Sequence, residues 1–513
     1  MPTIYTSLLA KHRPEDLVVA RKLPPVRKEA RLEPPPSGAR ASLLASEQYV
    51  SDRLAPARVA KRPKRPKRDF IVIGAGLAGL CAAYELKGLG YGVKVYEARE
   101  RVGGRVHSLG DFINRKVVEG GGELIGANHP LWNSYKTHFG LKFSDVQEYG
   151  NAPIRIGGHT LTSKQSKPLT DEFDDQLTAI ADLARTVLDA HEPWTNRNAK
   201  HLDRVSLTDW LRGAKCSPLC KQAIAEMMAA DNGIPAAEQS LLGVLAMVKG
   251  GGLDRYWTDS ELFRCVGGNQ RLAEKFRDYL NRRPNTVTLN AVAQRVERVG
   301  NKVKVSVEIE GKNEVITADE VILAVPPSVW YKIVFTDPEL AAHLKRAPKL
   351  GLNVKYLMRL SNRFWEDYSS SPTLTEDGPV DITWETTEAD ANPDFAMVAF
   401  SGASHAARCV KWPARQRRSK YLGALTPVYP RLGPALKKDR FMNWPEDPWT
   451  EAAYYFPRLG EVTEWGPFFK SGYKDWLHFA GEHTCYAFVG YMEGALNSGY
   501  RLAKRIAERD GLI

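Results

Sequence analysis

The chain has 513 residues, of which 43% are hydrophobic and 26% are charged, a composition typical of a globular protein with several domains. No apolar run reaches the roughly 18 residues that a membrane helix requires, and the first residues lack the apolar stretch of a secretory signal. We therefore expect a soluble, cytoplasmic protein with no membrane partner. The net charge of +12 is concentrated in residues 1–68, which contain 16 Lys or Arg and 6 Asp or Glu, so the nearly neutral body argues against a nucleic-acid partner.

Residues 1–68 are rich in proline and basic residues, including Pro34-Pro35-Pro36 and the run Arg58–Arg68. This composition disfavours a packed core, so we expect an N-terminal arm that is extended or disordered. Contact with nucleic acid, or the clasping of a second subunit, stays open for this arm. The six cysteines of the chain show no dense pattern, and Cys216 and Cys220 lack the further ligands of a zinc site. We predict no disulfide framework and no metal.

A strand, a glycine-rich turn, a helix and a second strand are predicted between Asp69 and Glu97. The turn has the spacing G-x-G-x-x-G, formed by Gly74, Gly76 and Gly79. In a dinucleotide-binding unit the first glycine permits the tight turn, the second lets the backbone approach a pyrophosphate, and the third lets the helix pack closely on the strand. An acid at the end of the second strand accepts the ribose hydroxyls, and Glu97 stands there. The sequence therefore predicts dinucleotide binding.

Two more glycine-rich segments follow. Gly104 precedes Arg105, whose guanidinium could neutralise phosphate charge. Gly121 and Gly122 lie in the segment VVEGGGELIG, where glycines again indicate close approach of the backbone to a ligand.

Residues 128–250 predict a helical insertion by the period of their apolar residues. Asp171 and Glu238 lie near plausible helix starts. The expected helices cover residues 131–139, 170–190, 207–211, 216–230 and 238–248.

Strands dominate the following part of the chain. The segment EGKNE between residues 309 and 315 predicts a hairpin, and Pro326-Pro327 closes an apolar strand. A basic, helical stretch over 404–436 is interpreted as a solvated face, and a final helix is predicted from Tyr491 to Glu508. The expected strands are 287–289, 292–298, 303–309, 315–317, 320–325, 353–359, 380–384 and 395–400, and a helix is expected over 269–280.

Six segments occur in a characteristic order: GAGLAGL…YEARERVGGRV, GGGELIG, VGGNQRL, AVPPSVWYKIVF, AYYFPRLGE and FAGEHT…GYMEGALNSGYRLA. Together they resemble the flavin-containing amine oxidase family, which includes monoamine, polyamine and L-amino-acid oxidases. The resemblance covers residues 69–510 and implies an α/β fold, with a Rossmann-like FAD-binding domain, a mixed-sheet substrate domain and a helical insertion. It also implies a homodimer. The implied domains are the arm 1–68, FAD-binding parts 69–127, 251–335 and 461–513, a helical domain with substrate-domain edges over 128–250, and a substrate domain over 336–460.

The resemblance also implies roles for individual residues. Lys332 matches the family lysine that follows the PPxxxxK segment and holds a water beside the flavin N5. It stands in apolar sequence, where a buried ammonium would be costly without a task. Family members with a covalent flavin carry a cysteine five residues before a Phe-Pro pair, and Glu451 occupies that position, so we predict non-covalent FAD. The predicted FAD contacts are Gly74, Gly76, Ala78, Gly79, Glu97, Ala98, Gly104, Arg105, Gly121, Gly122, Glu123, Val292, Gly481, Glu482 and Met492.

The substrate side is less complete. Tyr491, preceded by Gly490, matches one wall of the family's aromatic cage, whereas the second cage tyrosine falls at Ala452. Trp384 aligns with a carboxylate-binding tyrosine of L-amino-acid oxidases. The arginine that clamps the carboxylate in many of those enzymes is replaced by Glu123, which we also count as a substrate residue. An amino acid would need another cation, for which the sequence offers Arg255 and Arg264, while Glu385 and Glu388 are either a site for a basic side chain or solvated loop acids.

From this resemblance we predict an FAD-dependent L-amino-acid oxidase that converts L-amino acids to 2-oxo acids, ammonia and hydrogen peroxide with molecular oxygen. A monoamine or polyamine oxidase is the alternative. A chromatin-associated protein that uses the basic arm is a remote alternative, and a catalytically inactive FAD-binding protein is another.

Overall fold

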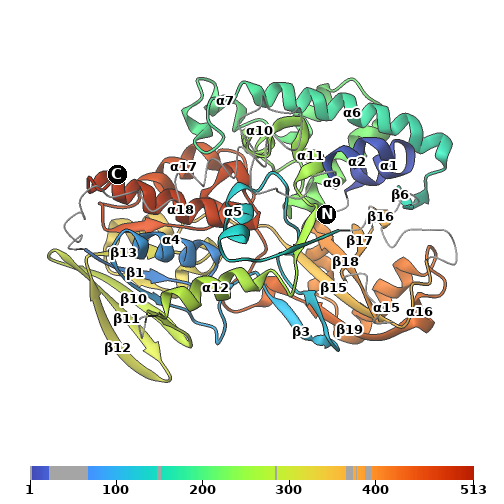
Figure 1. Cartoon of the computed structure of the whole chain (residues 1–513). Helices are drawn as coiled ribbons and strands as arrows, with labels where there is room; N and C mark the ends of the chain where they lie inside the picture. Colours follow the sequence, from blue (N-terminus) through green and yellow to red (C-terminus); the bar gives the residue numbers. More distant parts are fainter. Residues whose placement is uncertain are drawn as a thin grey trace, which may run out of the picture.

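The structure is a computed structural model that describes residues 3–21, 68–146, 152–282, 286–365, 374–376, 378–387 and 394–513. Figure 1 shows a helical layer above two sheet-containing regions, with the parallel sheet on one side and a larger mixed sheet on the other. The α/β class and the Rossmann-like unit predicted from the sequence are confirmed.

The parallel sheet has the order β20 (Leu477–Phe479), β13 (Glu320–Leu323), β1 (Asp69–Ile73), β2 (Gly92–Tyr96) and β9 (Val287–Thr288). All its neighbouring strands are parallel. The apolar run of β1 is buried on both faces, as is typical of parallel sheets. Phe70 and Val72 pack with α4 (Leu77–Gly88), whereas Ile71 and Ile73 pack against the opposite core. Segments from the beginning, middle and end of the chain therefore build one sheet.

Helices and a second sheet cover the two faces of the parallel sheet. The helices are α4, α12 (Gln270–Leu280) and α18 (Met492–Arg509). The second sheet has the order β12 (Lys312–Ala318), β11 (Lys302–Ile309), β10 (Ala291–Val299) and β14 (Val334–Phe335). The predicted hairpin is confirmed, because Ile309 pairs with Lys312 across a two-residue loop in which Glu310 and Gly311 have φ of 50° and 76°.

The mixed sheet is the predicted substrate-domain sheet. Its order is β19 (Leu436–Met442), β15 (Asn353–Leu360), β18 (Phe395–Gly402), β17 (Ile382–Glu385), β16 (Leu374–Glu376), β6 (Ile154–Ile156) and β7 (His159–Thr160). Only the β16–β6 pair is parallel among its described strands. One face packs on α14 (Ala403–Val410), α15 (Ala414–Leu425) and α16 (Leu432–Ala435), and the other on the hairpin of β3 (Ser108–Ile113) and β4 (Lys116–Glu119).

The helical layer consists of α6 (Ser163–Arg185), α7 (Ala199–Leu202), α8 (Leu207–Gly213), α9 (Pro218–Asn232) and α10 (Leu241–Gly250). The predicted starts at Asp171 and Glu238 are wrong. Thr162 caps α6 through a capping box with Gln165, and the Ser240 side chain accepts from the Gly243 backbone to cap α10. A hydroxyl that accepts a backbone N–H one turn later is a stronger start signal than an acid inside the first turns.

The predicted boundary of the helical domain at residue 128 is also wrong. Helix α5 (Pro130–His138) packs with the FAD-binding core, where Trp132 and Tyr135 are fully buried beside α4. Strand β5 (Phe143–Asp145) then pairs with β8 (Phe263–Cys265). The remaining elements are α11 (Tyr256–Asp259), α13 (Pro338–Leu344), α17 (Glu461–Ser471) and the 3₁₀ turns Pro193–Thr195, Leu253–Arg255, Pro327–Lys332, Trp444–Glu446, Glu482–Thr484 and Tyr486–Phe488.

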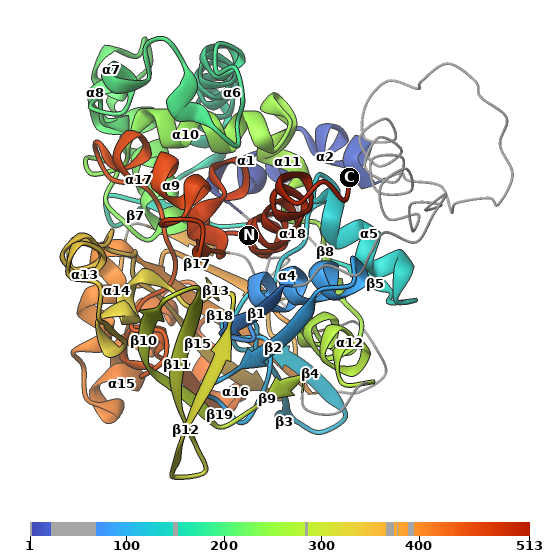
Figure 2. The same ribbon diagram turned by 90° about the vertical axis from the view of Figure 1, so that its left-hand side faces the viewer.

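The start of the chain departs from the predicted extended arm. Helices α1 (Ile4–His12) and α2 (Pro14–Arg21) lie against the helical layer, next to α6 and α11 (Figures 1 and 2). Leu8 and Leu9 of α1 are buried in the core of this layer, and the Tyr5 hydroxyl donates to Asp174 of α6. The apolar run at the very start of the chain outweighs the basic composition of residues 1–68 as a whole. The proline-rich stretch and the basic run up to residue 67 lie outside the described residues.

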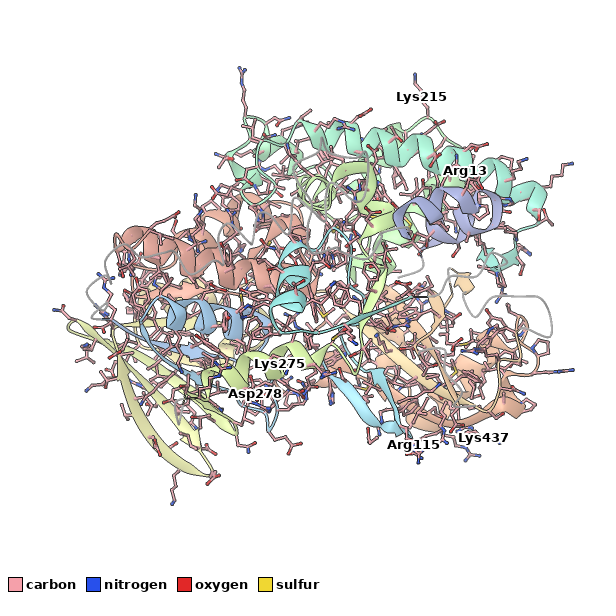
Figure 3. All side chains as sticks on the ribbon, in the orientation of Figure 1. Arg13, Arg115, Lys215, Lys275, Asp278 and Lys437 are labelled. Atoms are coloured by element: carbon pink, nitrogen blue, oxygen red, sulfur yellow. The ribbon has the colours of Figure 1, made fainter. Side chains whose placement is uncertain are left out.

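Charged side chains spread over different elements of the body. Arg115 at the β3–β4 turn, Lys215 in the helical layer and Lys437 on β19 extend outwards from separate parts of the surface (Figure 3). Within the described residues, no helix combines the length and apolarity needed to cross a membrane.

Candidate active site

A long cavity lies where the parallel sheet, the helical layer and the mixed sheet meet. The empty space between these elements, counted out to open solvent, is about 1920 Å³. The lining includes the turn after β1, the end of β2, the glycine segment around Gly121, and the start of α18. The predicted dinucleotide-binding turn and strands of the mixed sheet therefore line one continuous cavity.

The glycine turn has the geometry that a pyrophosphate requires. Gly74 has φ of +105°, a conformation that other residues rarely adopt. A Cβ at Gly76 would meet no atom within 4 Å, so its backbone is open to the cavity that it lines. A Cβ at Gly79 would lie 2.1 Å from the Gly74 carbonyl oxygen. Gly79 does not line the cavity, so its predicted direct contact is replaced by the close packing of α4 on the turn.

Glu97 is fixed beside this turn at the end of β2. Its carboxylate accepts from the backbone N–H of Ala75 at 2.7 Å and from that of Arg99 at 3.0 Å. The side chain is 4% exposed and lines the cavity. A buried carboxylate held by two backbone donors is oriented in advance for the ribose of a dinucleotide.

Arg105 and Glu482 come together from distant parts of the chain. Their side chains are 2.7 Å apart, and Glu482 also accepts from the backbone of Gly490 at 2.9 Å and of Tyr455 at 3.2 Å. The carboxylate holds the guanidinium in place without using all five of its donors. The remaining donors are available for phosphate oxygens.

Two glycines and the start of α18 line the part of the cavity where the flavin is predicted to lie. A Cβ at Gly121 would lie 1.9 Å from the Arg105 carbonyl oxygen, and one at Gly122 would lie 3.2 Å from Met492. Met492 is the first residue of α18, whose N-terminal N–H groups favour negative charge. Apart from Gly79, the predicted FAD contacts all line the cavity: Gly74, Gly76, Ala78, Glu97, Ala98, Gly104, Arg105, Gly121, Gly122, Glu123, Val292, Gly481, Glu482 and Met492.

Lys332 lines the cavity. Its position in the sequence had indicated burial in apolar surroundings, and the structure does not show this. Its side chain is 28% exposed, and its Nζ lies 2.6 Å from a carboxylate oxygen of Glu451. The ammonium also donates to the Pro448 carbonyl at 2.5 Å and lies 5.7 Å from the centre of a Trp449 ring. The carboxylate of Glu451 therefore compensates the charge of Lys332, which the apolar residues beside Lys332 in the sequence could not do.

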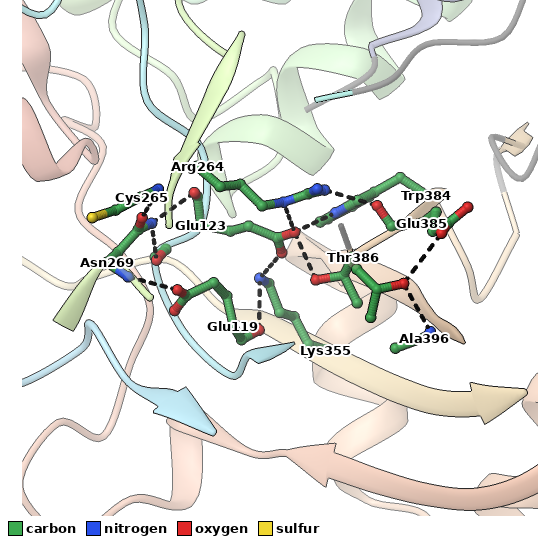
Figure 4. Close-up of polar contacts among 12 residues, drawn as sticks. Glu119, Glu123, Arg264, Cys265, Asn269, Lys355, Trp384, Glu385, Thr386 and Ala396 are labelled. Carbon is green, nitrogen blue, oxygen red and sulfur yellow. Dashed lines mark hydrogen bonds and ion pairs between the residues drawn. The ribbon is translucent and has the colours of Figure 1, made fainter. Parts of the chain in front are cut away.

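Glu123 is the centre of a buried network (Figure 4). Its carboxylate accepts from Arg264 at 2.8 Å and from Lys355 at 2.6 Å. Trp384 donates to it at 3.0 Å and Thr386 at 2.7 Å. Burial alone would raise the pKa of Glu123, but the two cations outweigh it and lower the pKa to about 2. Glu123 therefore stays ionised and is a partner for these cations, whereas a substrate carboxylate would be repelled.

The two arginines suggested as carboxylate clamps are both engaged by acids. Arg264 pairs with Glu123 and donates to the Glu385 carbonyl oxygen at 2.7 Å, and Arg255 pairs with Asp259 at 2.5 Å. Neither arginine lines the cavity. Glu385 itself pairs with Arg363 at 2.7 Å and does not line the cavity, while Glu388 lies outside the described residues. Trp384 does line the cavity, as predicted.

The aromatic cage is more complete than the sequence spacing indicated. Ala452 is buried in the helical-layer core, and Tyr454, two residues later, lines the cavity together with Tyr491. Gly490 permits this arrangement, because a Cβ there would lie 2.9 Å from the Tyr454 ring. The resemblance placed the second tyrosine of the cage at Ala452, whereas the structure brings Tyr454 to the cavity. None of the six cysteines, all within described segments, lines the cavity.

The cavity-lining residues that sequence reasoning missed include Asp231, Glu261 and Asn353. Asp231 stands at the end of a predicted helix, where an acid is unremarkable without its tertiary surroundings. By contrast, the cations of the lining all have carboxylate partners. Arg99 pairs with Asp447, Arg105 with Glu482, Lys332 with Glu451 and Lys355 with Glu123.

Comparison with known proteins gives a consistent result. Residues 77–507 match the family model described as flavin containing amine oxidoreductase. The flavin-containing amine oxidase B of Bos taurus is 29% identical over 476 residues, which cover 87% of each protein. A putrescine oxidase variant of known structure is 25% identical, with a TM-score of 0.77 over 86% of this chain and 99% of that one. Cyclohexylamine oxidase from Brevibacterium oxydans is 23% identical, with a TM-score of 0.76 over 87% of this chain and 100% of that one.

Proposed function

This chain belongs to the flavin-containing amine oxidoreductases and uses FAD, and from that premise we propose that it is an oxidase of primary amines with oxygen as electron acceptor. The observation that carries the proposal is the charge of the cavity. Its cations are paired, and its substrate end offers the acids Asp231 and Glu261. Such a site favours an amine over the α-carboxylate of an amino acid. The relatives named as amine oxidases support this alternative better than the L-amino-acid oxidase predicted from the sequence.

FAD, when bound, would accept a hydride from the carbon that bears the amine and would pass the electrons to oxygen, which forms hydrogen peroxide. The protein binds and orients both partners. Tyr454 and Tyr491 line the cavity, and we assign their rings to shielding the amine from water. Removal of water favours the neutral amine, whose lone pair assists loss of the hydride. The product imine is hydrolysed in water.

The residues beside the cofactor have electrostatic tasks. The N-terminus of α18 stabilises negative charge, since its first N–H groups have no partner within the helix. Lys332 lines the cavity, and we assign it to holding a water beside the reacting part of the flavin. The carboxylate of Glu451 holds the ammonium of Lys332 near the cavity.

The test is a peroxide assay with matched pairs of substrates. Phenethylamine is compared with phenylalanine, and n-pentylamine with 2-aminohexanoic acid, while flavin bleaching is followed without oxygen. We expect each amine to be oxidised faster than its α-carboxylated counterpart. Faster oxidation of the L-amino acids would restore the amino-acid oxidase reading. Failure of every amine and amino acid to bleach the flavin would favour an FAD-binding protein without catalysis.

A further inference from the structure

The C-terminal turn of α9 contributes Asp231 and Asn232 to the cavity lining. This helix of the helical layer packs against α6 and α8 and also against β18, and Asp231 is its penultimate residue (Figure 1). Asp231 lines the cavity. Among the described residues, no side chain donates a hydrogen bond to its carboxylate, whereas the Tyr454 hydroxyl donates to its backbone carbonyl. The acid therefore lies beside one wall of the aromatic cage without a cation of its own.

Asn353 adds a second acceptor at the same end. Asn353 lines the cavity and is 2% exposed, and within the described residues neither its Oδ1 nor its Nδ2 has a hydrogen-bond partner. It stands at the start of β15 against the end of α9, since Leu352 donates to the Gly233 carbonyl at 2.9 Å. An unpaired buried amide is unfavourable, because its polar atoms have lost water without gaining a partner. A ligand with a hydrogen-bond donor would satisfy the Oδ1 acceptor.

The helix itself favours a positive charge at this point. Helix α9 has 15 residues and ends at Asn232, followed by Gly233 in the left-handed conformation with φ of 71°. The last carbonyls of such a helix carry partial negative charge. Glu261, which also lines the cavity, accepts from the Tyr491 hydroxyl at 3.4 Å and adds a second acid near the cage.

The raised pKa of Asp231 agrees with the lack of a cationic partner for this acid among the described residues. Burial, with a smaller contribution from Asp381, raises the pKa of Asp231 to about 7. An ammonium beside the carboxylate would favour its ionised form.

We propose that Asp231 and Asn353 bind the distal ammonium of an α,ω-diamine, while its other amine lies between Tyr454 and Tyr491 for oxidation. This inference rests on the proposed amine oxidase function and specifies its substrate class. An ammonium group has three donors, which the Asp231 carboxylate, the Asn353 Oδ1 and the end of α9 can accept. An alkyl chain joining the two ammonium groups would span the cage. A monoamine of equal length leaves the acid and the amide without partners.

The first measurement needs no variant. Values of kcat/KM for 1,4-diaminobutane and 1,5-diaminopentane are compared with those for n-butylamine and n-pentylamine in the FAD-loaded enzyme. We expect at least about a tenfold preference for the diamine of each pair, because a hydrogen-bonded charge pair contributes roughly that much binding. Equal values, or a preference for the monoamines, would overturn the inference.

The second measurement changes the site. Asp231→Asn should reduce the ratio of diamine to monoamine kcat/KM by about 10- to 100-fold, mainly through a higher KM for the diamine. Glu226→Gln, on the same helix but outside the cavity lining, removes the same charge and should leave the ratio unchanged. A ratio that is unchanged in Asp231→Asn would refute the assignment. FAD absorbance and the unfolding temperature check the fold of each variant, and Asn353→Leu provides a second variant that should also reduce the ratio.

The two levels of the proposal fail differently. If monoamines bleach the flavin and diamines are no better, the diamine site is wrong and the amine oxidase stands. If no amine bleaches the flavin, the proposed function itself is wrong.

Discussion

Substitution of Glu123 by glutamine tests the buried network most directly. Glutamine preserves the shape and one acceptor oxygen, but it removes the charge that compensates Arg264 and Lys355. The side chain of Glu123 is 2% exposed and those of its two cationic partners are 8% exposed, so water screens little of the interaction. Removing one partner of a buried ion pair costs about 3–5 kcal/mol, since the remaining charge is left uncompensated. We expect a loss of that size in the free energy of unfolding of Glu123→Gln at pH 7.

Urea unfolding followed by tryptophan fluorescence measures this loss. Asp111→Asn is the matched control, because Asp111 is 69% exposed and pairs with Arg440 at 2.8 Å on the surface. That change should cost less than about 1 kcal/mol. Adding Lys355→Met to Glu123→Gln should recover part of the loss, since one uncompensated cation is removed. A cost for Glu123→Gln no larger than that of the surface control would refute the reasoning.

The pH dependence has a defined sign. The pKa of Glu123 in the folded protein, about 2, lies below the roughly 4.3 of an unfolded glutamate. The stability that its ionised form contributes is therefore present above pH 4.3 and is lost as the pH falls toward 2. The difference in stability between the native protein and Glu123→Gln should shrink over that window.

Four further predictions concern the cofactor, the reacting edge and a neighbouring acid. Acid precipitation should release the flavin into the supernatant, and flavin that stays with the pellet would indicate a covalent bond. Lys332→Met should slow flavin reduction or reoxidation by roughly 100-fold while the visible spectrum of bound FAD persists, and an unchanged rate in stopped-flow measurements would remove Lys332 from the reaction. Gly79→Ala should greatly weaken FAD binding, because the new Cβ would lie 2.1 Å from a turn carbonyl, whereas Gly88→Ala on the same helix meets no atom within 4 Å and should bind normally in a flavin titration. Burial, with Glu123 as a further cause, raises the pKa of Glu119 to about 7, so its neutral form contributes stability that is lost as the pH rises through 7. Glu119→Gln should thus be more stable than the native protein at pH 8, by up to about 3 kcal/mol, with little difference at pH 4, and equal denaturant midpoints at pH 8 would argue against a neutral Glu119.

The dinucleotide unit could be predicted because its information is local. The apolar run of β1, the three glycines of the turn and Glu97 lie within thirty residues, and each has a conformational or chemical task that few residue types perform. Most helices and strands of the body were predictable for the same reason, because the spacing of their apolar residues follows the period of the helix or strand that they form. The homodimer stays a prediction.

Element starts and the first helices were not predictable from composition. Averaging over residues 1–68 concealed the short apolar stretch that forms α1, because the basic residues of the following segment dominate the charge. Helix α6 begins earlier than Asp171 because Thr162 and Gln165 satisfy its first backbone donors. Such caps depend on one or two side chains and are easily overlooked in a periodic pattern.

The sequence by itself determined the family and the cofactor, and it predicted the glycines and acids that line the cavity, because these depend on short motifs whose order along the chain is preserved. The tertiary structure decided the charge of the substrate end. Whether Arg264 is available to a carboxylate depends on Glu123, which is 141 positions away in the sequence. The presence of Tyr454 rather than Ala452 in the cage depends on the path of a loop. Ion pairing and side-chain direction arise between segments that only folding brings together, and they turn the expectation of an amino acid into that of an amine.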